Sequence, residues 1–494
     1  MFGHPKGLYV LFSTELWERF SFYSMRNILT LYMVSVVLVA MAAERGAEAA
    51  GGHADQIYGA YLGFVYAATF VGGMLADRLL GQRRAIYIGG FLMSLAQFTL
   101  TTHAMLVHSG TSPQVLHPLF FTGLGLLACG NGFFKPNIST IVGTLYSTED
   151  RRRDSAFTIF YMGINIGATL ASFSAGIAQK WGWYLAYLLA GIGMIVSLVV
   201  FFAGRGWITG RGLPPAGARL VGRGRLGVPN VVPLIVGVLV FIPFAAYMMS
   251  RPEYVQSLAV IIAGPVLLYL LFEAWRAPRE EGGRMIVIIV LCIFSMVFWG
   301  TFELQGSTIT RFTQDQVNLW VLGWELPAAF VAGFVNPILI IALGIPFSVL
   351  WVLLDRKRME PSTPLKFSLG LAQLGLAFLM LWVGAKQAEH GGKSALAWLL
   401  LAYLFLTTGE LCLSPIGLSM VTKLSPARLV GVFMGVWFLS SALANVITGG
   451  VIGRLQAQSG YAPVFLGIAG TAGAAAVVLF VLTPLLKRLM HGIK

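Results

Sequence analysis

Charged residues are scarce in this chain. They make up 11% of its 494 residues, whereas a soluble domain carries about 25%. Hydrophobic residues make up 57%. This balance excludes an ordinary soluble domain and predicts a polytopic membrane protein.

Cysteine is also rare. The three copies, Cys129, Cys292 and Cys412, all lie in apolar runs, so we expect small core residues and no disulfide framework. A cleavable signal peptide is not expected either. The first apolar segment is too long and too charged for one, and no small-residue cleavage site follows it.

Basic residues outnumber acidic ones by 34 to 20. They lie in alternate loops and form no basic face, so we expect no nucleic acid partner. With the N-terminus inside, 24 of the 34 fall in cytoplasmic segments and seven on the opposite side. This bias predicts an even number of spans with both termini in the cytoplasm. The remaining three, Arg19, Arg26 and Lys135, lie within spans.

Apolar windows of about 20 residues, the length that spans a bilayer, occur fourteen times. They lie near 8–42, 54–79, 84–107, 116–145, 155–179, 182–204, 229–249, 255–275, 284–310, 328–354, 363–385, 394–423, 427–457 and 460–489. A polar linker at 205–228 follows the sixth. The pattern predicts an all-α fold of two six-helix bundles, 1–204 and 284–494, joined by a segment, 205–283, that carries two extra helices. In transporters built from two such halves, substrate binds between them near the midplane.

The first window, 8–42, contains Glu15, Glu18, Arg19 and Arg26. At 100° per residue these four fall on a single stripe. Each charge at the membrane centre costs roughly 2.5–3.5 kcal/mol, so such residues usually pair or line a water-filled cavity. We therefore expect one long first helix whose charged stripe lines a cavity.

Lys135, Glu303 and Glu410 also lie deep in predicted spans. Together with the first helix they give four acids and three bases. One negative charge is left over, so at least one carboxyl group should be protonated, or titrate easily, when the cavity closes. A proton carrier needs this property.

Several stretches resemble known transporter signatures. Residues 72–84, GGMLADRLLGQRR, resemble the loop signature of the major facilitator superfamily. Residues 15–20, ELWERF, resemble the E-x-x-E-R-F opening of the proton-dependent oligopeptide transporter (POT) family within it. Three more stretches resemble the same family: 132–137 (GFFKPN), 157–167 (FTIFYMGINIG) and 409–415 (GELCLSP). The resemblance covers essentially the whole chain, including the extra helix pair that bacterial members carry.

The resemblance implies a proton-coupled symporter that imports di- and tripeptides by alternating access, without a cofactor or metal. It implies a multi-pass protein of the bacterial inner membrane, embedded in the lipid bilayer as a single chain. Proton coupling would rest on Glu15, Glu18, Arg19, Lys135 and Glu303. Lys135 and Glu303 would form an ion pair across the halves that proton and peptide binding remake.

The resemblance also implies the substrate site. Arg26 and Lys135 would hold the peptide carboxylate, and Glu410, with Asn165 and Asn336, the peptide ammonium group. The full set of implied substrate-binding residues is Tyr23, Arg26, Tyr66, Lys135, Asn165, Trp299, Glu303, Asn336, Glu410, Ser414 and Trp437. The alternatives are structural ones: a buried ion pair for the charges, a bond between helices for the asparagines, and packing for the aromatic rings.

This sequence departs from the family pattern at two places. Phe22 stands where the family commonly has a second tyrosine, so one hydroxyl is lost. The second helix has no histidine at the depth where some animal relatives place one, because His53 is expected in the loop before it. His103, His108 and His117 cluster in the outside loop 103–118, where the alternatives are a metal site and, as we expect, solvated side chains. We therefore assign proton coupling to carboxylates.

Two other functions remain open. One is a carrier for nitrate or another small anion, which the acids Glu303 and Glu410 disfavour. The other is an intramembrane enzyme, but the sequence shows no Ser/His pair, no metal-binding histidine cluster and no paired catalytic aspartates in adjacent helices.

Overall fold

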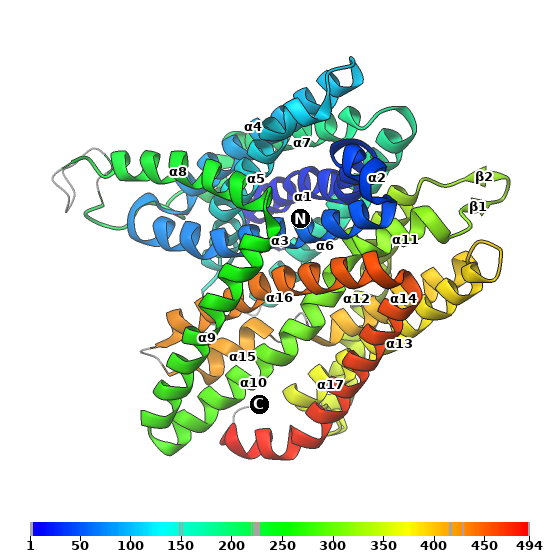
Figure 1. Cartoon of the computed structure of the whole chain (residues 1–494). Helices are drawn as coiled ribbons and strands as arrows, with labels where there is room; N and C mark the ends of the chain where they lie inside the picture. Colours follow the sequence, from blue (N-terminus) through cyan, green and yellow to red (C-terminus); the bar gives the residue numbers. More distant parts are fainter. Residues whose placement is uncertain are drawn as a thin grey trace. The chain divides into compact units, whose positions relative to one another are not determined.

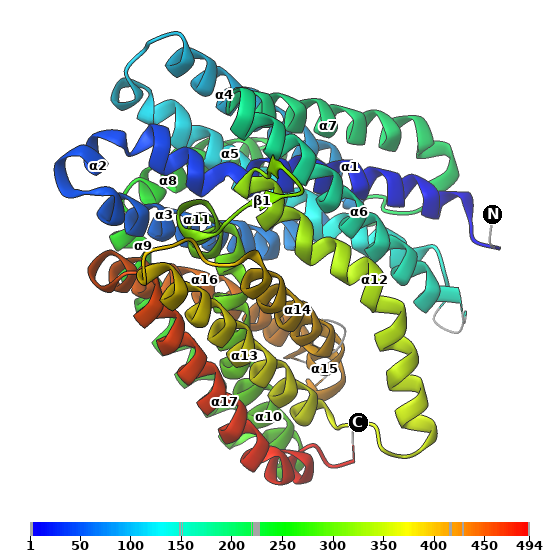
Figure 2. The ribbon, with the colours of Figure 1, turned by 90° about the vertical axis from the view of Figure 1, so that its right-hand side faces the viewer.

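The computed structural model describes residues 3–147, 150, 152–218, 220, 228–413, 417–426 and 429–492. These residues are almost entirely helical. Thirteen of their helices are long and apolar enough to cross a membrane, and a bent pair at the start of the chain raises the number to fourteen. The fourteen predicted windows and the all-α class are thus confirmed. The chain divides into two compact units, whose helices can be followed by colour in Figures 1 and 2.

The first unit comprises Met1–Val39, Phe64–Arg251 and Ala329–Phe334. Its complete elements are α1 (Lys6–Tyr32), η1 (Met33–Val37), η2 (Ala76–Leu80), α4 (Gln82–His108), α5 (Pro113–Thr144), α6 (Arg152–Trp181), α7 (Tyr184–Ala203), η3 (Gly204–Ile208) and α8 (Val231–Met249). Helix α1 packs against α6 and α7, and α4 packs against α5 and α7. Gly167 of α6 lies against the Leu16 carbonyl and Arg19, where a Cβ would collide. Close helix packing of this kind is typical of small residues in membranes.

The first span is bent, so the prediction of one long helix over 8–42 is wrong in this respect. After α1 the backbone winds into the π-helix η1, closed by the Leu38 amide donating to the Met33 carbonyl at 2.7 Å. Helix α2 (Val39–Arg45) then leaves at 62°. Hydropathy cannot detect this break, because the residues on both sides of it are apolar.

The second unit comprises Ala40–Gly63, Pro252–Ala328 and Val335–Lys494. Its elements are α9 (Pro252–Arg276), α10 (Arg279–Phe302), η4 (Glu303–Gly306), α11 (Thr308–Gln316), β1 (Trp320–Val321), β2 (Trp324–Glu325), most of α12 (Ala328–Arg356), α13 (Thr363–Glu389), α14 (Leu396–Leu413), α15 (Gly417–Leu424), α16 (Val430–Ser459) and α17 (Tyr461–Leu489). Helix α13 packs against α14 and α17, and α10 packs against α16.

Helix α3 (Ala47–Leu75) contributes its first half to this second unit. That half lies directly on α16, because two pairs of glycines, Gly52 with Gly453 and Gly59 with Gly449, remove the side chains between them. A Cβ on Gly52 would meet the Gly453 carbonyl, and one on Gly59 would meet the Gly449 Cα. The two backbones are therefore in contact over about two turns.

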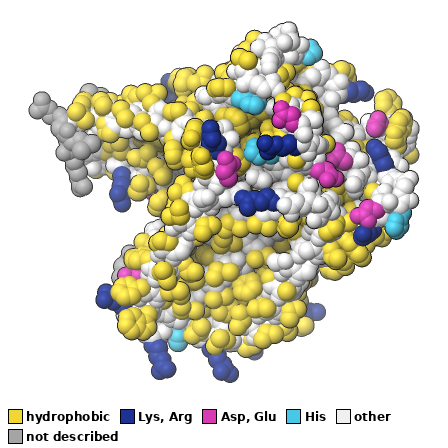
Figure 3. All heavy atoms as spheres, in the orientation of Figure 1, with side chains coloured by type: hydrophobic (Ala, Val, Ile, Leu, Met, Phe, Trp, Pro, Cys, Tyr) yellow, Lys and Arg dark blue, Asp and Glu magenta, His cyan; other side chains and the backbone are white. Residues whose placement is uncertain are grey.

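The two extra helices expose much of their apolar surface. Leu239 of α8 is 64% exposed, and Leu268 of α9 is 68% exposed. Figure 3 shows hydrophobic side chains covering most of the visible face over α9, α10 and α17, with basic side chains at its lower edge. A surface of this kind faces lipid rather than water.

Candidate functional site

Three charged residues of α1 form a buried cluster. Arg19 donates to both carboxylate oxygens of Glu18, from Nε at 2.5 Å and from Nη2 at 2.7 Å. Its Nε also lies 3.1 Å from Glu15 Oε1. All three residues are at most 3% exposed. Three of the four residues of the predicted stripe thus form an ion-pair cluster, held together because Glu15 and Arg19 are one helical turn apart. That the stripe lines a cavity stays a prediction.

The cluster has an excess of negative charge. Two carboxylates share one guanidinium, and Glu15 Oε2 is buried without a hydrogen-bond partner. Lys135 of α5 also interacts electrostatically with Glu15. A buried, ionised oxygen that receives no hydrogen bond is energetically costly.

Two further cations of the first unit lie over aromatic rings. The Lys135 ammonium is 5.0 Å from the centre of the Tyr66 ring, and the Arg26 guanidinium is 5.4 Å from the Tyr23 ring. All four side chains are half-buried. Lys135 and Tyr66 meet because α3 and α5 approach closely one turn away, where a Cβ on Gly132 would collide with Ala68. Cation–π contacts hold such cations in place without neutralising them.

A second polar group lies in the other unit, between α12 and α14. The Asn336 amide donates to Glu410 Oε2 at 3.1 Å and to the Thr407 hydroxyl at 3.0 Å. Glu410 is 8% exposed. Pro337 follows Asn336 inside α12 and cannot donate to the helix, so the backbone here is locally less regular. The pair presents a carboxylate and an amide oxygen, which are both acceptors.

The remaining predicted site residues lie on several helices. Trp299 packs edge-on against Phe302 near the end of α10, and Glu303 begins η4 at that same end. Trp437 of α16 is buried against Gly417. Ser414 lies outside the described residues.

Asn165 behaves differently from Asn336. Its amide donates to the Tyr161 carbonyl of its own helix, α6, at 3.0 Å. The predicted site residues thus belong to different parts of the chain. Lys135 belongs to the first unit and Glu303 to the second, and their ion pair stays a prediction.

The histidine prediction was wrong for two of three residues. His103 is fully buried in α4, where its Nδ1 lies 2.7 Å from the Tyr32 hydroxyl. His117 lies in α5, and its Nε2 donates to the Val37 carbonyl at 2.9 Å, next to the bend after α1. His108 is exposed at the end of α4, and His53 lies in α3 rather than in a loop. The connecting loop is shorter than hydropathy indicated.

Sequence reasoning also missed a buried ion pair. Arg311 is one of the seven basic residues that the charge count placed on the outside of the membrane. It is 4% exposed and bonds to Asp55 of α3, which is fully buried. Thr308 and Gln456 complete the hydrogen bonds of the pair. Burial lowers the pKa of Arg311, but Asp55, Tyr461 and Asp315 together raise it by more, so its pKa lies above the usual value and the guanidinium stays charged. The signal available was an acid inside the apolar window 54–79.

No group of three or more His, Cys, Asp or Glu side chains in the part of the chain that the structure describes is arranged to hold a metal ion. Cys129, Cys292 and Cys412 are all buried and free, as predicted.

A polytopic helical protein whose first helix buries a charged cluster has features that are common in membrane transporters. Comparison with known proteins identifies the family of transporters. A sequence profile of the POT family matches residues 83–463. Peptide transporter YePEPT of Yersinia enterocolitica is 34% identical, over 99% of this chain and 96% of the relative. Dipeptide and tripeptide permease A of Cronobacter turicensis is 30% identical, over 99% and 94%.

Solved structures agree with the sequence relatives. The crystal structure of peptide transporter POT in complex with sulfate matches with a TM-score of 0.83 at 34% identity, over 100% of this chain and 97% of that one. A mutant of peptide transporter POT in complex with alafosfalin gives a TM-score of 0.82 at the same identity and coverage. The chain belongs to the POT family. It is a transporter with the major facilitator fold and not an enzyme.

Proposed function

We propose that this protein is a proton-coupled symporter that imports di- and tripeptides by alternating access. The names of its relatives support the substrate class. The observation that carries the proton coupling is the α1 cluster, in which Glu15 and Glu18 share the single guanidinium of Arg19 and Glu15 Oε2 has no hydrogen-bond partner. A proton that enters this cluster removes an unpaired buried charge.

The same proposal assigns the proton path. Glu15, Glu18 and Arg19 take up and release the proton, and Lys135 is linked to them through its attraction to Glu15. Lys135 pairs with Glu303 when no peptide is bound. The peptide then competes for Lys135 and the proton for Glu303, and this competition couples the two fluxes.

The peptide is held at its two ends by opposite charges. Arg26 and Lys135, each placed over a tyrosine ring, bind the carboxylate. Glu410 and Asn336, already joined to each other, bind the ammonium group with Asn165. Side chains fit against the remaining positions of the site, which are Tyr23, Tyr66, Trp299, Glu303, Ser414 and Trp437.

We further propose that the protein works as a monomer in a bacterial inner membrane, with both termini cytoplasmic and the division into 1–204, 205–283 and 284–494. The excess of basic residues in alternate loops supports this orientation. Cysteines introduced near each terminus and labelled with a membrane-impermeant reagent, in intact and in lysed spheroplasts, test it. Labelling of both sites only after lysis is expected, and labelling of either site in intact cells contradicts the orientation.

Uptake of labelled dialanine into proteoliposomes tests the function. An inward proton gradient should accelerate uptake, and unlabelled dipeptide should compete while excess nitrate should not. Uptake that ignores the gradient rejects the coupling. Competition by nitrate but not by dipeptide supports a small-anion carrier instead.

A further inference from the structure

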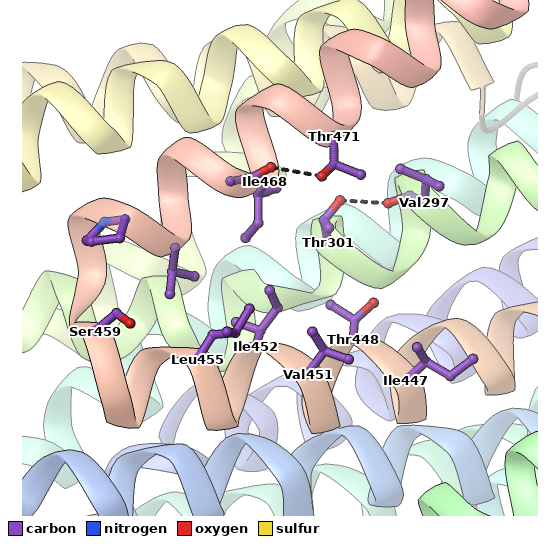
Figure 4. Close-up of a pocket in the computed structure, with 13 residues that line it drawn as sticks. Val297, Thr301, Ile447, Thr448, Val451, Ile452, Leu455, Ser459, Ile468 and Thr471 are labelled. Carbon is purple, nitrogen blue, oxygen red and sulfur yellow. Dashed lines mark hydrogen bonds between the residues drawn. The ribbon is translucent and has the colours of Figure 1, made fainter.

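A cavity of about 350 Å³ opens in the second unit, apart from all the residues assigned to transport. It lies between the second half of α16, the first half of α17 and the end of α10 (Figure 4). Residues 447–459 of α16 form one wall from end to end. Val464, Gly467, Ile468 and Thr471 of α17 form the opposite wall.

The walls are mainly carbon, from Val, Ile, Leu and Pro side chains, with the hydroxyls of Thr301, Thr448, Ser459 and Thr471 among them. The Thr301 hydroxyl donates to the Val297 carbonyl at 2.7 Å, and the Thr471 hydroxyl donates to the Gly467 carbonyl at 2.9 Å. Both hydroxyls are thus used on their own helices, a common arrangement in membrane spans. An apolar cavity of this kind does not bind water well and accepts a hydrocarbon.

The cavity is a groove that opens on the lipid-facing surface. Its floor is buried, with Val464 and Ile468 each 4% exposed, whereas its rim is open, with Val451 49% and Leu455 44% exposed. The rim residues continue the apolar outer surface of α16. The groove is therefore reached from the bilayer and not from water.

The length of the groove matches one leaflet. Residues 447–459 of α16 extend about 18 Å at 1.5 Å per residue, and half of a hydrocarbon core of about 30 Å is about 15 Å. Ser459 stands at one end of the groove (Figure 4), where the predicted topology places the outer membrane–water interface.

We propose that this groove binds one acyl chain of an outer-leaflet phospholipid, with the headgroup near Ser459 and the chain lying between α16 and α17 down to Thr301. The assignment relies on the orientation proposed above but not on peptide transport. A bound chain would fill the gap between α16 and α17.

Photocrosslinking with a phosphatidylglycerol that carries a diazirine in mid-chain tests the proposal in nanodiscs. Gly467→Leu places a side chain into the groove, because a Cβ there meets open space. Gly470→Leu is the matched control, since it adds the same side chain to the same helix at a position that also meets open space but does not line the groove. Val451→Trp narrows the groove from the opposite wall if Gly467→Leu cannot be reconstituted.

We expect label on the groove walls of α16 and α17 at least tenfold above that on the exposed face of α8. Gly467→Leu, or Val451→Trp, should remove this excess, and Gly470→Leu should keep it. Equal labelling of all lipid-facing helices overturns the proposal, and so does an excess on the groove walls that Gly467→Leu and Val451→Trp leave unchanged. Both readouts are independent of uptake, so a failure here leaves the transport proposal standing.

Discussion

Arg311 and Asp55 form a buried ion pair although 256 positions separate them in the sequence. The guanidinium donates to the carboxylate from Nη2 at 2.5 Å and from Nε at 3.3 Å, and the side chains are 5% and 0% exposed. The pair ties α11 to the first half of α3. Removing one partner leaves the other charge buried and unpaired.

We therefore expect Asp55→Asn to lower the free energy of unfolding by about 3–5 kcal/mol. Asp315→Asn is the control, because Asp315 accepts one hydrogen bond from Tyr461 at 2.7 Å and is more exposed. Its loss should cost about 1 kcal/mol. Thermal unfolding in detergent compares the two, and an equal loss for both variants contradicts the assigned ion pair.

Glu18→Gln should separate proton coupling from peptide movement. The variant leaves Arg19 with one carboxylate, Glu15, so the cluster no longer has excess negative charge to accept a proton. Gradient-driven accumulation of dialanine should fall at least tenfold, while exchange of labelled for unlabelled peptide continues. Loss of exchange together with accumulation indicates a folding defect instead, which the detergent unfolding assay detects.

Glu303→Gln and Lys135→Ala should both abolish gradient-driven uptake, because each removes one charge of the proposed switch pair. The informative control is the double variant, which leaves no uncompensated charge. It should express and unfold like the wild type while remaining inactive. Wild-type uptake by either single variant removes these two residues from the coupling.

The ring of Tyr66 should set how well Lys135 binds the peptide carboxylate. Tyr66→Leu removes a cation–π contact worth about 1 kcal/mol, so KM should rise about fivefold. Tyr66→Phe keeps the ring and should stay within twofold of the wild type. Equal effects of the two variants contradict the cation–π role and point to the hydroxyl.

A loop carboxylate should not control the pH profile. Hydrogen bonds from the side chain and the backbone amide of Arg152 hold the pKa of Asp150 at about 2. A lowered pKa stabilises the fold only above its unfolded value of about 4, and this effect is lost as the pH falls toward 2. Asp150→Asn should therefore leave the dependence of uptake on pH unchanged between about 5 and 8, and a shifted profile contradicts this view.

The sequence was sufficient to locate the spans because hydropathy adds over about 20 residues. It was insufficient wherever a few hydrogen bonds or backbone angles determine the local structure. The bend after α1 depends on one π-helical turn that ends at Leu38, and the β1–β2 hairpin depends on positive φ angles at Leu322 and Gly323. Neither changes the average hydrophobicity of its window.

The candidate site was predictable only where its residues lie close together in the sequence. Charges inside an apolar helix stand out, and those of α1 pair within one turn, so periodicity alone placed them together. The Asp55–Arg311 pair and the contact of His103 with Tyr32 join distant segments. No local pattern encodes such contacts, since they depend on which helices pack together.

The central claim is that peptide and proton enter together. Proteoliposomes loaded with a pH-sensitive dye, such as pyranine, report this directly when dialanine is added outside at an inside-negative potential. The wild type should acidify the lumen as peptide accumulates, and Glu18→Gln should not. Accumulation of peptide by the wild type without any fall in internal pH would contradict the account.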